Sequence, residues 1–124
     1  MTEIIFPTQA EFRGWLEGMP SAAMAGVPRK VTSCPIAMCL KRWGGAHFPA
    51  VAPITGDGWW RSVGGDIDTQ KPLPRWANEF GLRVDNNTGC FVTASECLSI
   101  LADIPDDERP STAALAAETI GWLP

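Results

Sequence analysis

Several residue types and patterns are scarce in this chain of 124 residues. It has no tyrosine and only one histidine, His47, so any histidine-assisted step would depend on that residue. No apolar run approaches the roughly 18–20 residues that a membrane-spanning helix needs. The N-terminus also lacks the basic region and apolar core of a signal peptide. We therefore expect a soluble, cytoplasmic protein that is not inserted in a membrane.

Charge is also limited, and it is acidic overall. Fourteen carboxylates against ten Lys and Arg residues give a net charge of −4. This balance argues against a broad basic surface for the nucleic-acid backbone and suits a protein that meets a basic partner. Apolar residues make up 45% and charged residues 19%, a composition typical of globular proteins. The length predicts a single domain over residues 1–124.

The usual signatures of cofactor and metal sites are missing as well. The glycine pairs form neither a dinucleotide-binding GxGxxG pattern nor a phosphate loop. The four cysteines are Cys34, Cys39, Cys90 and Cys97. Their spacings do not match a zinc knuckle, and without a secretory signal we expect free thiols. The sequence therefore predicts no metal and no cofactor.

Helix signals recur along the chain. Two helix starts are predicted by capping boxes, at 8–11 and 93–96, and two by prolines in a first turn, at 33–35 and 73–74. Apolar residues at helical spacing follow each of them. An Ala-rich stretch over 111–120 predicts a last helix. The long segment 19–32 is expected to be a loop.

Between these helices, residues 48–63 are predicted to form a β-hairpin. Thr55-Gly56-Asp57-Gly58 supplies the turn. Pro49 and Pro53 share parity, which fits an edge strand whose proline side faces solvent. Residues 66–70 are either loop or a short third strand. The fold class is thus α+β, with a small antiparallel sheet packed against four to five short helices.

Cys34 is the sharpest candidate for chemistry. A thiol at the start of a helix feels the positive end of the helix dipole, which lowers its pKa, and His47 would then have to act as the base. The structural interpretation, which we favour, is that Cys34 packs the helix start and that His47 is a loop residue. Asp57, Asp66 and Asp68 are likewise read as turn residues rather than as a cation site.

The aromatic content is the most informative positive feature: six Trp and five Phe. Trp59 and Trp60 are adjacent in the second arm of the hairpin, so their rings must point to opposite faces. One ring can enter the core, and the other, with Arg61, is a candidate binding anchor, because Trp and Arg dominate interface hot spots. The alternative is that this chain covers both faces.

The remaining tryptophans are assigned by their spacing. Trp15, Trp43 and Trp76 fall on helical stripes and are expected in the core. Trp122 either docks the last helix or takes part in a contact.

Four segments carry a resemblance: Ser33-Cys34-Pro35-Ile36-Ala37, the stretch from Leu73 to Phe80, Val84-Asp85, and Thr93-Ala94-Ser95-Glu96. Together they resemble small uncharacterised proteins of bacterial and phage genomes, which share a CP-[LI]-A helix start, an LPxWAxxF segment and a T-A-x-E helix start. The resemblance implies an accessory protein of a phage or mobile element and brings no activity with it.

These observations lead to an expected function. We expect a small non-enzymatic module that binds a protein partner through Trp59, Trp60 and Arg61, and that inhibits a host defence complex. The alternative is a small-ligand or thiol-dependent enzyme site centred on Cys34. Homo-oligomerisation through the Trp hairpin is a third reading.

Overall fold

The computed structural model describes residues 6–43, 45, 49–61, 71–87 and 89–111. In chain order the elements are α1 Gln9–Glu17, β1 Met24–Gly26, α2 Pro35–Arg42, β2 Ala50–Ala52, β3 Trp59–Arg61, β4 Lys71–Pro72, α3 Arg75–Asp85, β5 Val92–Thr93 and α4 Ala94–Ala102. Within these residues there are four helices and two antiparallel sheets, which confirms the α+β class. The helix expected over 111–120 lies almost entirely outside the described residues.

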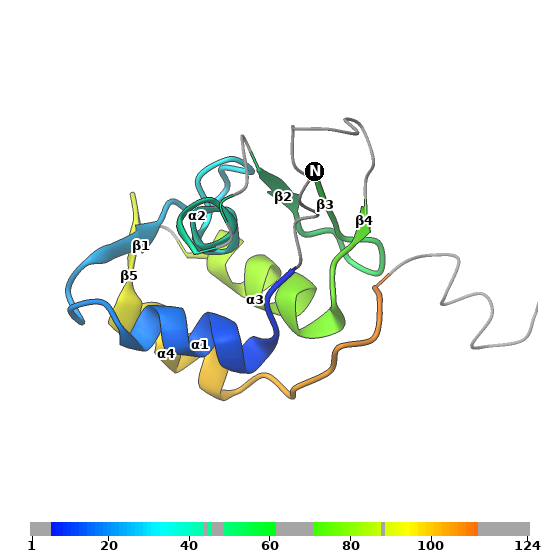
Figure 1. Cartoon of the computed structure of the whole chain (residues 1–124). Coiled ribbons are helices and arrows are strands. Elements are labelled where there is room, and N and C mark those ends of the chain that lie inside the picture. Colours follow the sequence, from blue (N-terminus) through cyan, green and yellow to red (C-terminus); the bar gives the residue numbers. More distant parts are fainter. Residues whose placement is uncertain (1–5, 44, 46–48, 62–70, 88, 112–124) are drawn as a thin grey trace, which may run out of the picture.

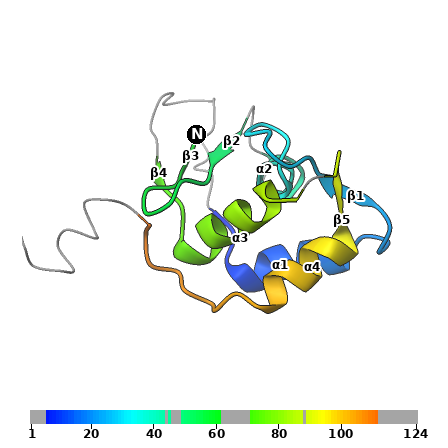
Figure 2. The same cartoon turned by 180° about the vertical axis from the view of Figure 1, so that it is seen from behind.

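The helices occupy the middle of the molecule, and the two sheets lie at opposite ends (Figure 1). Helices α1 and α4 run side by side, and α3 lies beside them in both views (Figure 2). The three-stranded sheet sits beyond the first turn of α3, and the β1–β5 pair lies at the far end. The buried side chains of all four helices meet in one core.

Both predicted capping boxes are present. In α1 the Glu11 N–H donates to Thr8 Oγ1 at 3.1 Å, and Glu11 Oε1 accepts from the Thr8 N–H at 2.9 Å. In α4 Thr93 and Glu96 make the same two bonds at 3.1 and 2.8 Å. Each box satisfies backbone donors that the first turn of a helix cannot pair internally, which is why the two starting points were readable from sequence.

Helix α3 begins differently. Its N-cap is Pro74, whose side chain offers no hydrogen bond. The Arg75 N–H instead donates to Arg109 O at 2.8 Å, and the Trp76 N–H to Asp107 O at 3.0 Å. We call residues 104–111 the strap: the segment that follows α4, runs along the lower side of Figure 1 and ends beside β4. Backbone carbonyls that are distant in sequence thus accept from N–H groups that a capping side chain usually pairs.

Gln9 ties the strap to the other end of the chain. This side chain is almost fully buried, and its Nε2 donates to Ile104 O at 3.0 Å. The Gln9 N–H also donates to the Glu108 carboxylate at 3.1 Å. A buried amide is tolerated because it is hydrogen-bonded, and the contact fixes the strap against the start of α1.

The predicted hairpin is confirmed in a shorter form. Strand β2 pairs antiparallel with β3, and β4 adds a third strand on the far side of β3, in the order β2-β3-β4. Residues 62–70, which include the predicted segment 66–70, lie outside the described residues. Strand β2 is an edge strand, as the prolines indicated. Its proline side does not simply face solvent, however, because the Val51 N–H donates to Val31 O at 2.8 Å.

The second sheet was not foreseen, since the sequence predicted a loop over 19–32. Strand β1 pairs antiparallel with β5, Met24 opposite Thr93 and Gly26 opposite Val92. Gly26 permits this arrangement: a Cβ there would lie 2.4 Å from Pro35 N, so the strand passes almost in contact with the first turn of α2.

Asn78 holds the hairpin turn against α3. Its Oδ1 accepts from the Ile54 N–H at 3.0 Å, and its Nδ2 donates to Ile54 O at 2.8 Å. One side-chain amide therefore pairs with one backbone residue as a neighbouring strand would. On the next turn of α3, a Cβ on Gly81 would come within 2.8 Å of Pro53. Close packing against Pro53 therefore explains why a glycine occupies this helical position.

We expect Asn78→Leu to lower the free energy of unfolding by about 2 kcal/mol, because the Ile54 N–H loses its acceptor in a partly buried site, whereas Ile54 O keeps the Asp57 N–H as a donor. Asn78→Asp is the matched control. It keeps an acceptor for the Ile54 N–H but sets a carboxylate against Ile54 O, so its deficit should shrink as acid protonates the carboxyl group. Urea unfolding at neutral and acidic pH measures both. An Asn78→Leu protein as stable as the wild type would contradict the assigned bonds.

Candidate interaction surface

The two adjacent tryptophans separate as the alternation of β3 requires. Trp60 points inward, is 5% exposed and packs its ring 5.2 Å from that of Phe6, centroid to centroid. Phe6 in turn contacts Trp76 at 6.1 Å, so Trp60 joins the central aromatic cluster. The Lys71 ammonium lies 5.6 Å from the Trp60 ring centroid. Trp60 is therefore a core residue, and of the pair only Trp59 is partly exposed.

Trp59 lies on the opposite face of β3 and is half-buried. By register its neighbours on the adjacent strands are Ala52 and Pro72, both smaller than an indole. The Arg61 guanidinium lies 5.7 Å from the Trp59 ring centroid, a cation–π arrangement on the same face. We call this set, Ala50, Ala52, Trp59, Arg61 and Pro72, the outer face of the sheet. Trp59 and Arg61 are its two large side chains.

Trp43 does not lie in the core as its spacing predicted. It is 42% exposed, whereas Trp76 is 1% exposed and Trp15 is half-buried against the core. Trp43 is the C-cap of α2, one residue beyond the last helical turn. Helical spacing places a residue on one side of a helix, but that side is buried only where neighbouring elements pack against it. At Trp43 they do not bury the side chain. Trp122 lies outside the described residues.

Further apolar side chains are exposed at the other end of the molecule. Met24 and Phe91 are 50% and 48% exposed. Met24 pairs with Thr93, and Phe91 lies two residues before Thr93, so both project from the outward face of the β1–β5 pair. Their exposure was not predicted, because the sequence contains no sign of strand β1. Phe91 and Val92 are adjacent, so in a strand they lie on opposite faces, and this alternation was the available signal.

Cys34 is where the sequence placed it, at the N-cap of α2, but its surroundings are unsuited to a nucleophile. The side chain is buried and makes no capping hydrogen bond. Burial raises the pKa of the Cys34 thiol to about 11, outweighing the opposite effect of the Ala37 and Ile36 backbone N–H groups. A nucleophilic cysteine needs the reverse shift. His47, the proposed base, lies outside the described residues.

The other three cysteines differ in burial. Burial raises the pKa of both Cys39 and Cys97 to about 12, whereas Cys90 is exposed. We expect a thiol-specific disulfide reagent at pH 8 to modify Cys90 rapidly in the native protein and all four cysteines in denaturant. Cys90→Ser should abolish the rapid phase. Rapid modification of Cys34 in the Cys90→Ser protein would show instead that this thiol is accessible and reactive.

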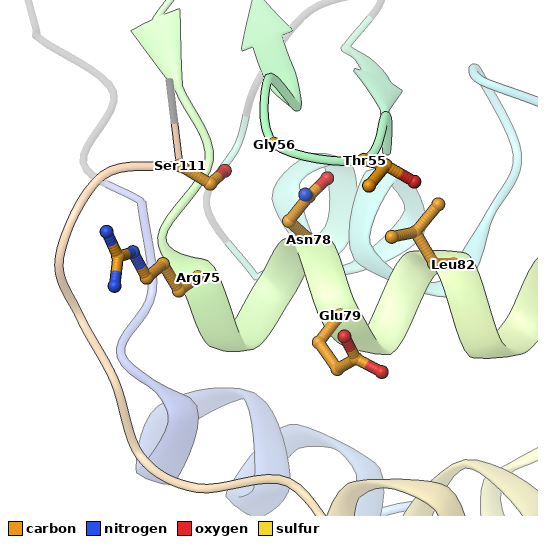
Figure 3. Close-up of a pocket in the computed structure, with 7 residues that line it drawn as sticks. All are labelled: Thr55, Gly56, Arg75, Asn78, Glu79, Leu82 and Ser111. Carbon is orange, nitrogen blue, oxygen red and sulfur yellow. The ribbon is translucent and has the colours of Figure 1, made fainter. Parts of the chain in front are cut away.

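A hollow of about 290 Å³ lies between the hairpin turn, α3 and the end of the strap. Its lining residues are Thr55, Gly56, Arg75, Asn78, Glu79, Leu82 and Ser111 (Figure 3).

Most polar groups around this hollow already have partners within the chain. Asn78 holds Ile54, Ser111 Oγ donates to Leu73 O at 2.9 Å, and Glu79 pairs with Arg83 at 2.8 Å. Figure 3 also shows the charged ends of Arg75 and Glu79 directed away from each other. We therefore interpret the hollow as a gap between packed elements rather than as a ligand site.

Two further surveys cover only the part of the chain that the structure describes. No group of three or more potential metal-ligating side chains occurs there. No helix in that part is long and apolar enough to cross a membrane.

Comparisons of the chain with protein-family models, with curated proteins and with solved structures gave no match.

Proposed function

We propose that this protein is a small module that binds another protein through the outer face of its three-stranded sheet. One observation carries the proposal: β3 places Trp60 in the core and leaves Trp59, beside the Arg61 guanidinium, half-buried on the opposite face. Trp and Arg are the residue types that contribute most to protein interfaces. Because β3 is paired on both sides, the backbone that carries both side chains is already ordered before binding.

The acidic balance supports a basic partner for this module, and four free cysteines suit work in the reducing cytoplasm. Inhibition of a host complex by a protein from a phage or mobile element stays a prediction, which the identity of the partner tests. The alternative site at Cys34 is weakened by the burial of that thiol and its raised pKa. Homo-oligomerisation through the same face would appear in light scattering as a mass above that of one chain.

The experiment is comparative affinity capture from the source organism with folded variants. Trp59→Ala and Arg61→Ala should each lose the partner that the wild type retains. Phe91→Ala and Arg83→Ala are the matched controls, since each removes an exposed side chain of similar type elsewhere, and both should retain it. The proposal fails if the two test variants capture the partner as well as the controls do, with thermal unfolding showing all four folded.

A further inference from the structure

One long stretch of this acidic protein carries positive charge and no carboxylate. Between Glu17 and Asp57 there is no Asp or Glu, yet this stretch holds Arg29, Lys30, Lys41 and Arg42. In space this stretch includes α2 and the loop before it, away from the acidic strap on the lower side of Figure 1. Arg29 is bonded to Asp85, since its backbone N–H donates to the Asp85 carboxylate at 2.8 Å, so the cations of this stretch that remain for a partner are Lys30, Lys41 and Arg42.

Helix α2 shows how that surface is built. Its buried side comprises Pro35, Ile36, Ala37, Cys39 and Leu40. The opposite side carries Met38, Lys41 and Arg42, which are neighbours because residues three and four apart share a helix face. Lys41 and Arg42 are exposed, and no ion pair within the described residues engages either one.

Apolar side chains accompany these cations at both ends of the helix. Trp43 follows Arg42 directly and is 42% exposed. Val31, 46% exposed, precedes the helix beside Lys30, whose carbonyl accepts from the Cys34 N–H at 2.8 Å and so joins this loop to the first turn. We call Lys30, Val31, Met38, Lys41, Arg42 and Trp43 the α2 surface. It combines exposed apolar side chains with cations that no ion pair among the described residues engages.

We propose that the α2 surface binds an acidic segment of a partner protein. Carboxylates of the segment would pair with Lys41, Arg42 and Lys30, and its apolar side chains would contact Trp43 and Val31. Favourable interaction with the C-terminal end of the helix dipole accounts for the placement of Lys41 and Arg42, but not for the exposed Trp43 and Val31 beside them. Both kinds of group are explained by an occupant that is acidic and partly apolar.

The observations favour a protein segment over a nucleic acid. A polyanion experiences the charge of the whole molecule, which is repulsive here, and draws most of its affinity from many phosphate contacts. A short acidic segment needs only the local cations and also buries apolar groups. This surface is distinct from Trp59 and Arg61 and is proposed independently of them.

A short fluorescein-labelled peptide of alternating Glu and Leu is the probe, with binding followed by fluorescence anisotropy. Lys41→Glu/Arg42→Glu should weaken binding at least about tenfold, and Trp43→Ala severalfold, with wild-type affinity falling as salt rises. Arg13→Glu/Arg83→Glu is the matched control: it makes the same change in net charge elsewhere and should leave the affinity within about twofold. Trp59→Ala should also leave it unchanged, which separates this proposal from the previous one.

Three outcomes would overturn the proposal. The first is no measurable binding of the peptide at low salt. The second is an equal loss in the control double variant, which would indicate a nonspecific charge effect. The third is tighter binding of a single-stranded oligonucleotide of the same length than of the peptide, which would assign the α2 surface to nucleic acid.

Discussion

Trp60→Ala is expected to lower the free energy of unfolding by about 3–5 kcal/mol, the usual cost of removing a large buried aromatic side chain. Trp60 is 5% exposed and contacts Phe6 within the central cluster. Trp59→Ala should cost less, about 1–2 kcal/mol, because its side chain is only partly buried and one of its contacts is with the Arg61 guanidinium. Two adjacent tryptophans in one strand should therefore differ severalfold in their contribution to stability.

Chemical unfolding followed by far-ultraviolet circular dichroism measures this difference without depending on tryptophan emission. Equal destabilisation by the two substitutions would contradict the assignment of one ring to each face. The comparison also bears on the binding experiment. Loss of a partner in a Trp60→Ala protein would reflect unfolding, whereas the same loss in Trp59→Ala reports on the surface.

Gly26→Ala is expected to lower the free energy of unfolding by about 3 kcal/mol. Among the described glycines at which an added methyl group would collide with backbone atoms, we expect this substitution to be the most damaging. The new Cβ would lie 2.4 Å from Pro35 N and 2.7 Å from Cys34 C. Neither atom can rotate away as a side chain could, so β1 must move off the start of α2. That shift would also disturb the pairing of Gly26 with Val92.

Gly14→Ala provides the matched control. Gly14 is exposed within α1, and a Cβ there would have no atom within 4 Å outside the helix's own backbone. Alanine in an exposed helical position is favoured over glycine, so this substitution should raise the free energy of unfolding by about 0.5–1 kcal/mol. Thermal and urea unfolding compare the two. A Gly26→Ala protein with wild-type stability would mean that β1 does not approach α2 this closely.

Local signals accounted for much of the fold. The boxes at Thr8 and Thr93 and the prolines at Pro35 and Pro74 each mark a helix start through interactions within one turn, so they can be recognised without tertiary information. The hairpin was readable for a similar reason, because strand alternation and the turn at 55–58 are local. The same alternation required Trp59 and Trp60 to face apart, but it could not say which ring is buried.

The remainder depended on long-range contacts. Strand β1 consists of Met24, Ala25 and Gly26, residues with little strand preference, and it exists because β5 pairs with it. The exposure of Trp43 depends on which elements cover the end of α2. For Cys34, the sequence indicated a helix start that lowers the pKa, whereas burial has the larger effect and raises it. Each outcome is decided by packing rather than by neighbours in the chain.

The strap has a consequence for the order in which the chain can fold during synthesis. Helix α3 is made well before residues 107 and 109, whose carbonyls accept from its first N–H groups, and Gln9 waits still longer for Ile104 and Glu108. In an emerging chain α1 would have its own capping box, but the first N–H groups of α3 and the side chain of Gln9 would lack their partners until the strap leaves the ribosome. Because nascent domains fold as units, folding of this domain should not be complete before the strap has been synthesised.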